Sequence, residues 1–392
     1  MSKRSVRSAP LRGKRALVRV DFNVPLTDDL RVADDRRIAE ALPTLNYLLE
    51  QGARPVLMSH LGRPDGVRVP ELSLRPVAKH LEGLLHRPVA LAPDPTGPRA
   101  ESMAASPPER GLVLLENLRF DPGEEANDAE FAGSLARMGD LFVEEAFGTV
   151  HRAHASTVGV AKLLPAYAGF LVEKEIGELS RLMGQPERPF VAILGGAKVK
   201  DKLPMLRKFR ERADTLLLGG AMAFPLLREL GADQGGPPTE PGLVKEVRAF
   251  LDGPAGKGAK VRLPVDFMVQ DPRSGTVEEA DAMHLPEGWQ PLDIGPRTRA
   301  LFREHLRNSR TVFFNGPMGK IEDPRFAQGT KEVLLALKGM PGVHVAAGGD
   351  SARALVDLGV EGAFTYISTG GGAAIEFIEG RELPGLAVLP EG

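Results

Sequence analysis

One pattern restricts the fold of this chain more than any other: a short apolar run that ends in glycines and continues as a helix. In VHVAAGGDSARALV (residues 343–356), an apolar run typical of a buried parallel strand stops at Gly348 and Gly349, and a helical pattern follows from Ser351. A turn of this kind presents free backbone N–H groups and the positive end of the helix dipole, which bind anions. The segment therefore predicts an anion site.

Asp350 lies at the same turn, where its carboxylate would repel a bare phosphate. A divalent cation between the two removes this repulsion, because Mg²⁺ is usually held by one or two carboxylates together with substrate phosphates. On its own, the segment fits an ordinary strand-to-helix turn with Asp350 as the helix N-cap equally well. The case for a phosphate site bridged by a cation therefore depends on the recurrence of the pattern elsewhere in the chain.

The second half of the chain repeats the pattern four times, with apolar runs at 190–194, 215–218, 311–314 and 364–368. The turns that follow contain Gly195, Gly219, Asn315 and Gly371. Several strands that end in glycine turns predict one parallel sheet with a ligand at its carboxyl edge, where glycine lets the backbone approach a phosphate closely.

The first half also alternates apolar runs with helical patterns, and this predicts a second parallel sheet. The expected strands are 16–20, 55–59, 88–91, 111–116 and 141–144. Residues 92–110 are rich in proline and are expected to form a loop. A helix is predicted over 167–182, between the two halves, and residues 383–389 have an extended apolar pattern.

Charged and polar residues follow the strands of the first half. They are Asp21, Asn23, Arg37, His60, Arg63, Arg119 and Arg152. If these strand ends share one sheet, the arginines converge on one surface, which suits a small, multiply charged anion because guanidinium groups bind such oxygens bidentately. The alternative is that each arginine is an ordinary solvated residue, and for any single one this is the better explanation.

Length and composition set the remaining limits. A chain of 392 residues is expected to form two domains, and a net charge of -2 gives no reason to expect a nucleic-acid or membrane partner. The chain has no cysteine, which excludes disulfides, thiolate catalysis and cysteine-ligated metals. The basic start resembles a transit peptide only faintly, because a strand begins at Ala16, so we expect a cytoplasmic protein.

Common nucleotide-binding motifs are absent. No G-x-G-x-x-G follows the first strand, which weighs against a dinucleotide-dependent dehydrogenase, and Gly319-Lys320 is followed by Ile321, so that it is not a P-loop. A non-catalytic two-domain anion-binding protein could use the arginines as well. It would need neither Asp350 nor the lysines of the second half.

Eight motifs, in this order and spacing, resemble the phosphoglycerate kinase family over residues 16–389. They are VRVDFNVPL, SHLGRP, LLENLRF, AFGTVHRAHAST, GGAKVKDK, FFNGPMGKIE, GGDSARAL and STGGGAAIEF. The resemblance implies reversible phosphoryl transfer between 1,3-bisphosphoglycerate and ADP. It assigns the phosphoglycerate to the strand-end residues of the first half, with Arg37 rather than Arg36 at the arginine-isoleucine position.

The resemblance further implies that the second half binds Mg-ADP or Mg-ATP. It assigns nucleotide contacts to Lys202, to Glu322 at the ribose and to Gly348, Gly349, Asp350 and Ser351, with Asp350 at the metal. Gly219, Pro291 and Asn315 complete the expected nucleotide set. Lys198 matches a lysine at the transferring phosphoryl group. Three departures from the family pattern are Glu145 in place of aspartate, Lys320-Ile321, and Pro291 where a pocket glycine is common.

Transfer requires in-line positioning and neutralisation of charge on the equatorial oxygens, which Mg²⁺, Arg37, Lys198 and the helix start at Gly371 could supply. No general base is needed, because both acceptors are already ionised. The expected architecture is α/β: two Rossmann-like domains, each a parallel sheet flanked by helices, over 1–166 and 183–379. They are joined by the interdomain helix 167–182 and a hinge, with the tail 380–392 packed on the first domain. A monomer is expected.

Overall fold

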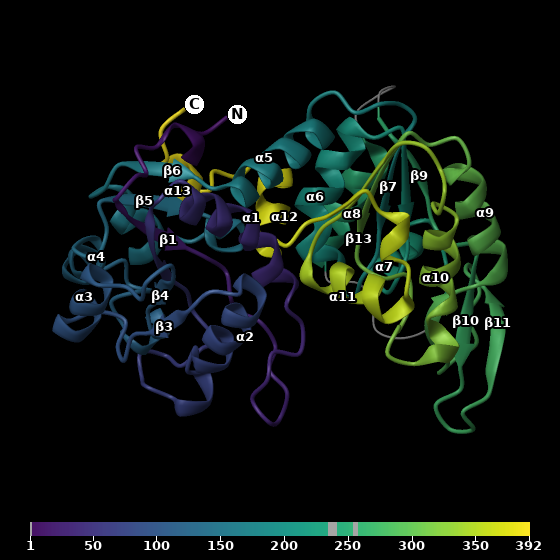
Figure 1. Cartoon of the computed structure of the whole chain (residues 1–392). Coiled ribbons are helices and arrows are strands. Elements are labelled where there is room, and N and C mark those ends of the chain that lie inside the picture. Colours follow the sequence, from purple (N-terminus) through teal and green to yellow (C-terminus); the bar gives the residue numbers. More distant parts are fainter. Residues whose placement is uncertain (1, 234–240, 254–257) are drawn as a thin grey trace. The chain divides into compact units, whose positions relative to one another are not determined.

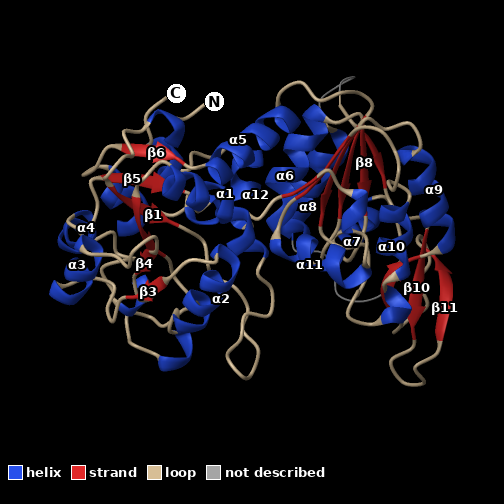
Figure 2. Cartoon of the chain, viewed as in Figure 1, coloured by secondary structure: helices blue, strands red, loops and turns tan. Residues whose placement is uncertain are grey.

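The structure, a computed structural model, describes residues 2–233, 241–253 and 258–392. The chain forms two compact units: Met1–Ser180 with Gly380–Gly392, and Arg181–Glu379 (Figure 1). In each unit helices surround a parallel sheet, which confirms the expected fold class (Figure 2). Every helix in the described part of the chain is too short or too polar to span a lipid bilayer.

The first unit contains a six-stranded sheet in the order β3-β4-β2-β1-β5-β6. Its strands are β1 (Arg15–Arg19), β2 (Arg54–Met58), β3 (Val89–Leu91), β4 (Leu112–Leu114), β5 (Leu141–Glu144) and β6 (Ala166–Ala168). All neighbouring pairs are parallel. Strand β1 is central and its residues Ala16, Leu17 and Val18 are fully buried, because helices cover both faces of a parallel sheet.

Four helices of this unit cover the sheet: α1 (Arg36–Glu50), α2 (Arg75–Leu85), α3 (Pro98–Ala105) and α4 (Ala129–Ala136). In α1, Ile38, Ala41, Leu45 and Leu48 are buried, at the three- and four-residue spacing of one helix face.

Two expectations were wrong. Helix α3 occupies the segment expected to be a loop, with Pro98 at its start, where proline is tolerated.

The second wrong expectation concerns the tail, where the short helix α13 (Pro384–Ala387) replaces the extended segment expected at 383–389. The amide of Gly385 donates to the carbonyl oxygen of Val150 at 2.8 Å, so the tail packs on the first unit. The connecting helix α5 (Phe170–Met183) begins three residues later than expected, because Tyr167 belongs to β6 and Gly169 packs against Glu145 with no room for a Cβ.

The second unit has a six-stranded parallel sheet in the order β15-β14-β13-β7-β8-β9. Its strands are β7 (Phe190–Leu194), β8 (Thr215–Leu218), β9 (Lys260–Arg262), β13 (Thr311–Asn315), β14 (Val343–Ala346) and β15 (Tyr366–Ile367). The helices are α6 (Val199–Arg212), α7 (Ala223–Glu229), α8 (Pro241–Asp252), α9 (Pro296–Leu306), α10 (Gln328–Leu335), α11 (Gly349–Leu358) and α12 (Gly372–Glu379). The recurring strand-to-glycine pattern is thus confirmed as one sheet.

This unit also contains a three-stranded antiparallel sheet that the sequence analysis did not anticipate. It has the order β11-β10-β12, from β10 (Asp266–Gln270), β11 (Val277–Asp281) and β12 (Gln290–Ile294). Pro291 pairs with Val269 beside a register shift between Met268 and Val269. Proline has no N–H for a regular ladder, and it is tolerated at such an irregularity.

Candidate functional site

The carboxyl edge of the first sheet gathers the residues expected to bind an anion. Because β1, β2, β4 and β5 are parallel, the segments after them leave the sheet on the same side. These segments carry Asp21, Asn23, His60, Arg63, Arg119 and Arg152. Arg37 lies in the first turn of α1.

Arg37 is fixed to the loop after β1. Its Nη1 lies 3.1 Å from Oδ2 of Asp21 and donates to the carbonyl oxygen of Asn23, also at 3.1 Å. Asn23 accepts the N–H of Gly62 through Oδ1 at 2.9 Å, which connects this loop to the segment after β2. The Arg37 side chain remains 33% exposed, so further N–H groups can reach a ligand.

Arg119 adds a second cation at this edge. Its Nη1 donates to the carbonyl oxygen of Gly62 at 2.8 Å, and its Nη2 lies 3.0 Å from Oε1 of Glu125. Burial lowers the pKa of Arg119, and the nearby carboxylate of Glu125 opposes this effect. Among the described residues, its Nε has no hydrogen-bond partner, so one buried donor is left for an anion.

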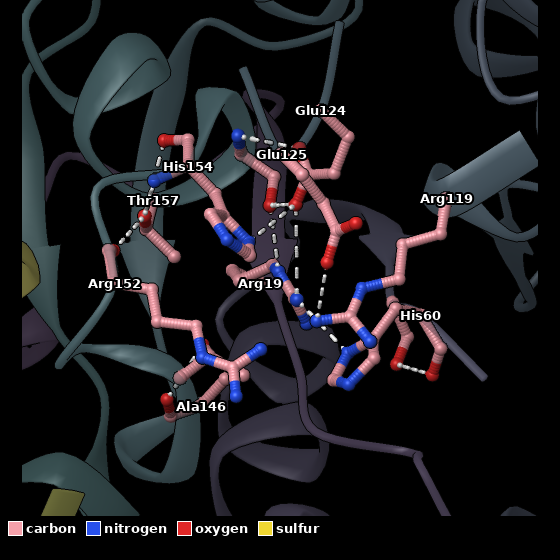
Figure 3. A network of polar contacts seen from close by, with 12 residues as sticks. Arg19, His60, Arg119, Glu124, Glu125, Ala146, Arg152, His154 and Thr157 are labelled. Carbon is pink, nitrogen blue, oxygen red and sulfur yellow. Dashed lines mark hydrogen bonds and ion pairs between the residues drawn. The ribbon is translucent and has the colours of Figure 1, made fainter. Parts of the chain in front are cut away.

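His60 is buried beside Arg19, a residue that the sequence analysis overlooked (Figure 3). Nδ1 of His60 lies 3.1 Å from Nη2 of Arg19. Burial, followed by the positive charges of Arg19 and Arg119, lowers the pKa of His60 well below its usual value. His60 is therefore neutral at neutral pH.

Arg19 belongs to a buried polar group with Glu124 and His154 (Figure 3). The buried Ser156 is part of the same group. Its Nε donates to Oγ of Ser156 at 2.8 Å, and its Nη2 lies 4.0 Å from Oε1 of Glu124. Nδ1 of His154 lies 3.7 Å from the same oxygen, and burial lowers the pKa of His154 to about 4. The only signal in the sequence was an arginine within an apolar strand, which requires a buried partner.

Arg63 and Arg152 make fewer contacts with the other residues at this edge of the sheet. Both are exposed. Nε of Arg152 donates to Nε2 of His151 at 3.2 Å, whereas Arg63 forms no hydrogen bond or ion pair with any residue that the structure describes. The structure thus brings Asp21, Asn23 and Arg37 into direct contact and leaves these two guanidinium groups at the surface.

Two adjoining pockets open at the carboxyl edge of the second sheet. One, of about 380 Å³, contains Lys198, Lys202, Asn315, Gly348, Gly349, Asp350, Ser351 and Gly371. The other, of about 460 Å³, contains Pro291 and Glu322. Gly196, Ala197, Pro317 and Asp350 line both pockets, so the two cavities share a wall.

Gly219 lines neither pocket. A Cβ at this residue would overlap Sδ of Met318, so Gly219 is required for packing. The next residue, Gly220, lines the larger pocket with a φ of +67°. The sequence pattern located the turn but did not show which glycine reaches the cavity.

Within the smaller pocket, Lys202 is held by Asn315. Nζ of Lys202 donates to Oδ1 of Asn315, whose Nδ2 donates to the carbonyl oxygen of Ala347 at 2.7 Å. Burial lowers the pKa of Lys202, and the charge of Asp350 opposes this effect. Gly348 has a φ of +95°, and a Cβ there would lie 2.6 Å from Nδ2 of Asn315, so only glycine fits.

The start of α11 carries the expected metal ligand. Asp350 is exposed in the first turn of this helix, and Oγ of Ser351 accepts the N–H of Gly316 at 2.9 Å. One carboxylate beside free helix N–H groups fits Mg²⁺, which takes few protein ligands when substrate phosphates supply the others. Among the described residues there is no group of three or more His, Asp or Glu placed to hold a metal.

Two further candidates face the same pocket. Lys198 is the exposed N-cap residue of α6 and makes no capping hydrogen bond through its side chain. Gly371 has a φ of +52° and directly precedes α12. A lysine ammonium and a helix start that line one cavity can both neutralise phosphate oxygens.

Comparisons with known proteins agree with this geometry. A family model described as phosphoglycerate kinase matches residues 6–381. The chain is 51% identical to a phosphoglycerate kinase of Rubrobacter xylanophilus, over 100% of this chain and 99% of the relative, and 48% identical to one of Moorella thermoacetica, over 100% of both. Solved structures of phosphoglycerate kinase from Coxiella burnetii (TM-score 0.85, 33% identity) and Pyrococcus horikoshii OT3 (TM-score 0.84, 35% identity) each match over 98% of both chains.

Proposed function

The chain belongs to the phosphoglycerate kinase family and transfers a phosphoryl group between 1,3-bisphosphoglycerate and ADP in glycolysis, and from this premise we propose which of its residues act in the transfer. The family match over residues 6–381 carries the assignment of the reaction. The assignment of the residues depends on the contacts described above.

We propose that the first unit binds the phosphoglycerate. Asp21 and Asn23 hold Arg37 in place, and Arg119 offers a buried donor beside them. The exposed Arg63 and Arg152 supply outer contacts to the phosphate of the substrate. Hydrogen bonds from several guanidinium groups suit a ligand with a phosphate and a carboxylate.

We propose that the second unit binds the nucleotide, with its phosphates in the smaller pocket and its adenosine in the larger one. Lys202 contacts the phosphates, Glu322 the ribose, and Pro291 forms part of the adenine wall. Asp350 lines both pockets, and this supports a position for it where the phosphates continue from the adenosine. It would hold Mg²⁺, which when bound lowers the negative charge of the phosphate oxygens.

For the transfer, we propose that Arg37, Lys198 and the helix start at Gly371 stabilise the charge on the equatorial oxygens. No residue is needed to remove a proton, because the accepting β-phosphate or carboxylate is already ionised. His60 accordingly has no role as a base. In-line transfer needs the reacting atoms about 3–3.5 Å apart, so both ligands must meet in one closed arrangement.

We propose that this closure bends the chain near the helix expected at 167–182, between domains at 1–166 and 183–379. The enzyme is proposed to act as a cytoplasmic monomer on small molecules alone. Its net charge of -2 supplies no general attraction for nucleic acid.

The experiment that tests the function is a coupled assay of ATP formation from ADP and 1,3-bisphosphoglycerate. We expect turnover that depends on Mg²⁺ and is lost with excess chelator. A non-catalytic anion-binding protein would bind 3-phosphoglycerate in calorimetry without turnover. Reduction of a nicotinamide cofactor, followed by absorbance, would instead identify a dehydrogenase.

A further inference from the structure

Arg19 reaches one ring nitrogen of His60 and thereby restricts where the imidazole can carry its proton. The guanidinium nitrogen Nη2 lies 3.1 Å from Nδ1 of His60. Arginine has only N–H donors and stays protonated, so Nδ1 must accept. A neutral imidazole with an accepting Nδ1 carries its hydrogen on Nε2.

Arg19 cannot easily leave this position. Its side chain is 1% exposed, its Nε donates to Oγ of Ser156 at 2.8 Å, and its Nη1 donates to the carbonyl oxygen of Val20. Ser156 in turn donates through Oγ to Oε1 of Glu124 at 2.5 Å, and Glu124 is the buried carboxylate nearest to Arg19. These hydrogen bonds hold Nε and Nη1 in place, and Nη2 is left to contact Nδ1 of His60 (Figure 3).

The surroundings of His60 also disfavour a second proton. The groups whose charges act on His60 are Arg19, Arg119, Arg37 and His154, and the buried carboxylate of Glu124 lies 4.0 Å from Nη2 of Arg19. A protonated His60 would place another positive charge in a buried site beside three arginines, which is unfavourable. His60 is 5% exposed, and its Nε2 has no hydrogen-bond partner in the described part of the chain.

We propose that Arg19 is a positioning residue that fixes His60 in its neutral Nε2–H form, so that His60 donates a hydrogen bond to an oxygen of the phosphoglycerate. The opposite tautomer would direct a nitrogen lone pair towards an anionic ligand and would repel it. This inference depends on the proposed phosphoglycerate site. Arg19 lies in the apolar strand β1 and is buried, so it does not touch the ligand directly, as Arg37 and Arg119 are proposed to do.

The direct test is two-dimensional ¹H–¹⁵N NMR of the full chain labelled on histidine, with the His60 signals assigned from a His60→Gln spectrum. For the ligand-free wild type we expect an unprotonated Nδ1 and a protonated Nε2 throughout the range from about pH 5 to about pH 8. A protonated Nδ1, or a His60 that titrates near its ordinary pKa, would overturn the proposal. This readout does not depend on activity, so it separates failure of the inference from failure of the proposed function.

A double variant, Arg19→Met with Glu124→Gln, removes the guanidinium group without leaving a buried charge unpaired. We expect His60 in this variant to lose its single tautomer and to gain a proton within the same pH range. The KM for 3-phosphoglycerate should rise about tenfold with the KM for ATP unchanged, and His60→Gln, which keeps a neutral donor, should bind 3-phosphoglycerate better than His60→Ala. An unchanged His60 spectrum in the double variant, or equal binding by the two His60 variants, would contradict the proposal; if the double variant does not fold, the wild-type spectrum still decides.

Discussion

The side-chain oxygen of Asn315 accepts a hydrogen bond from the ammonium group of Lys202, a residue 113 positions earlier in the chain. Asn315 ends β13, and its amide nitrogen is itself anchored to the carbonyl oxygen of Ala347 at 2.7 Å. The position of the lysine in the pocket is therefore determined by the end of a neighbouring strand as well as by its own helix.

Asn315→Ala should release Lys202 and weaken nucleotide binding. We expect the KM for ATP to rise about tenfold or more, because a hydrogen bond to a charged group contributes about 1.5–3 kcal/mol. Steady-state kinetics with each substrate varied in turn would measure this. Lys200→Met serves as the control. Lys200 is exposed, lies in α6 like Lys202 and lines neither pocket, so this variant should leave the KM for ATP unchanged. A rise in the KM for 3-phosphoglycerate alone would contradict the proposed role of Asn315.

Asp350→Asn should abolish most of the Mg²⁺-dependent activity. A metal that neutralises phosphate oxygens contributes several kcal/mol to the transition state, so we expect kcat to fall by about 100-fold or more. The affinity for 3-phosphoglycerate in calorimetry should not change. Asp357→Asn is the matched control: Asp357 lines the larger pocket on the same helix and is paired with Arg353 at 3.4 Å. If the turnover of the wild type persists in excess chelator, the assignment of Asp350 as a metal ligand is wrong.

Arg37→Ala should lower kcat more than it weakens either ligand. If the guanidinium group stabilises charge that develops during transfer, the loss should be about 100-fold in kcat. Arg63→Ala should mainly raise the KM for 3-phosphoglycerate, because Arg63 is exposed and is proposed as an outer contact. Arg36→Ala, which alters the neighbouring exposed residue, should have little effect. A normal kcat with only a raised KM in Arg37→Ala would show that Arg37 contributes to binding alone.

Glu144→Gln should make the stability of the protein less sensitive to pH. Oε1 of Glu144 accepts the amide of Ala146 at 2.9 Å, Oε2 has no partner among the described residues, and burial raises the pKa of this carboxyl to about 8. Between about pH 5 and about pH 8 the folded state keeps a proton that the unfolded chain has lost, so the free energy of unfolding falls as the pH rises. The variant has no proton to lose. The free energy of unfolding of the variant, measured relative to that of the wild type, should therefore be higher at about pH 8 than at about pH 5, by about 1 kcal/mol or more.

Urea unfolding of both proteins at the two pH values measures this gain. Asp140→Asn provides a control, because the hydrogen bond from Arg15 holds the pKa of Asp140 below its usual value and the carboxylate stays ionised throughout this range. Its stability difference from wild type should therefore stay constant. If the Glu144→Gln difference also stays constant, Glu144 is not protonated in the folded protein.

Solution scattering should detect closure. Each ligand is proposed to bind its own unit, so neither alone should produce the full change. We expect the radius of gyration to be smallest with 3-phosphoglycerate and Mg-nucleotide together. Equal radii for the free and doubly liganded enzyme would exclude a hinge movement of measurable size.

The sequence alone determined the features that depend on neighbouring residues. Apart from the edge strands β6 and β9, which were missed, apolar runs predicted the strands of both parallel sheets, in the second half through the glycines that follow them. Gly348 and Asp350 were assigned to an anion-binding turn, and both line a pocket in the structure. These predictions succeeded because strand burial and the backbone freedom of glycine are local properties. Local signals also misled: Pro98 within a proline-rich stretch suggested a loop, whereas it starts α3.

Only the tertiary structure decided which side chains meet. The order β3-β4-β2-β1-β5-β6 brings Arg19 of β1 beside His60, which follows β2, and beside Ser156, which follows β5. The parallel pairing of β7 with β13 likewise places Asn315 where Lys202 can reach it. These contacts join residues far apart in the chain, and strand order depends on packing over the whole sheet. No local pattern around Arg19 or Asn315 therefore contains the identity of its partner.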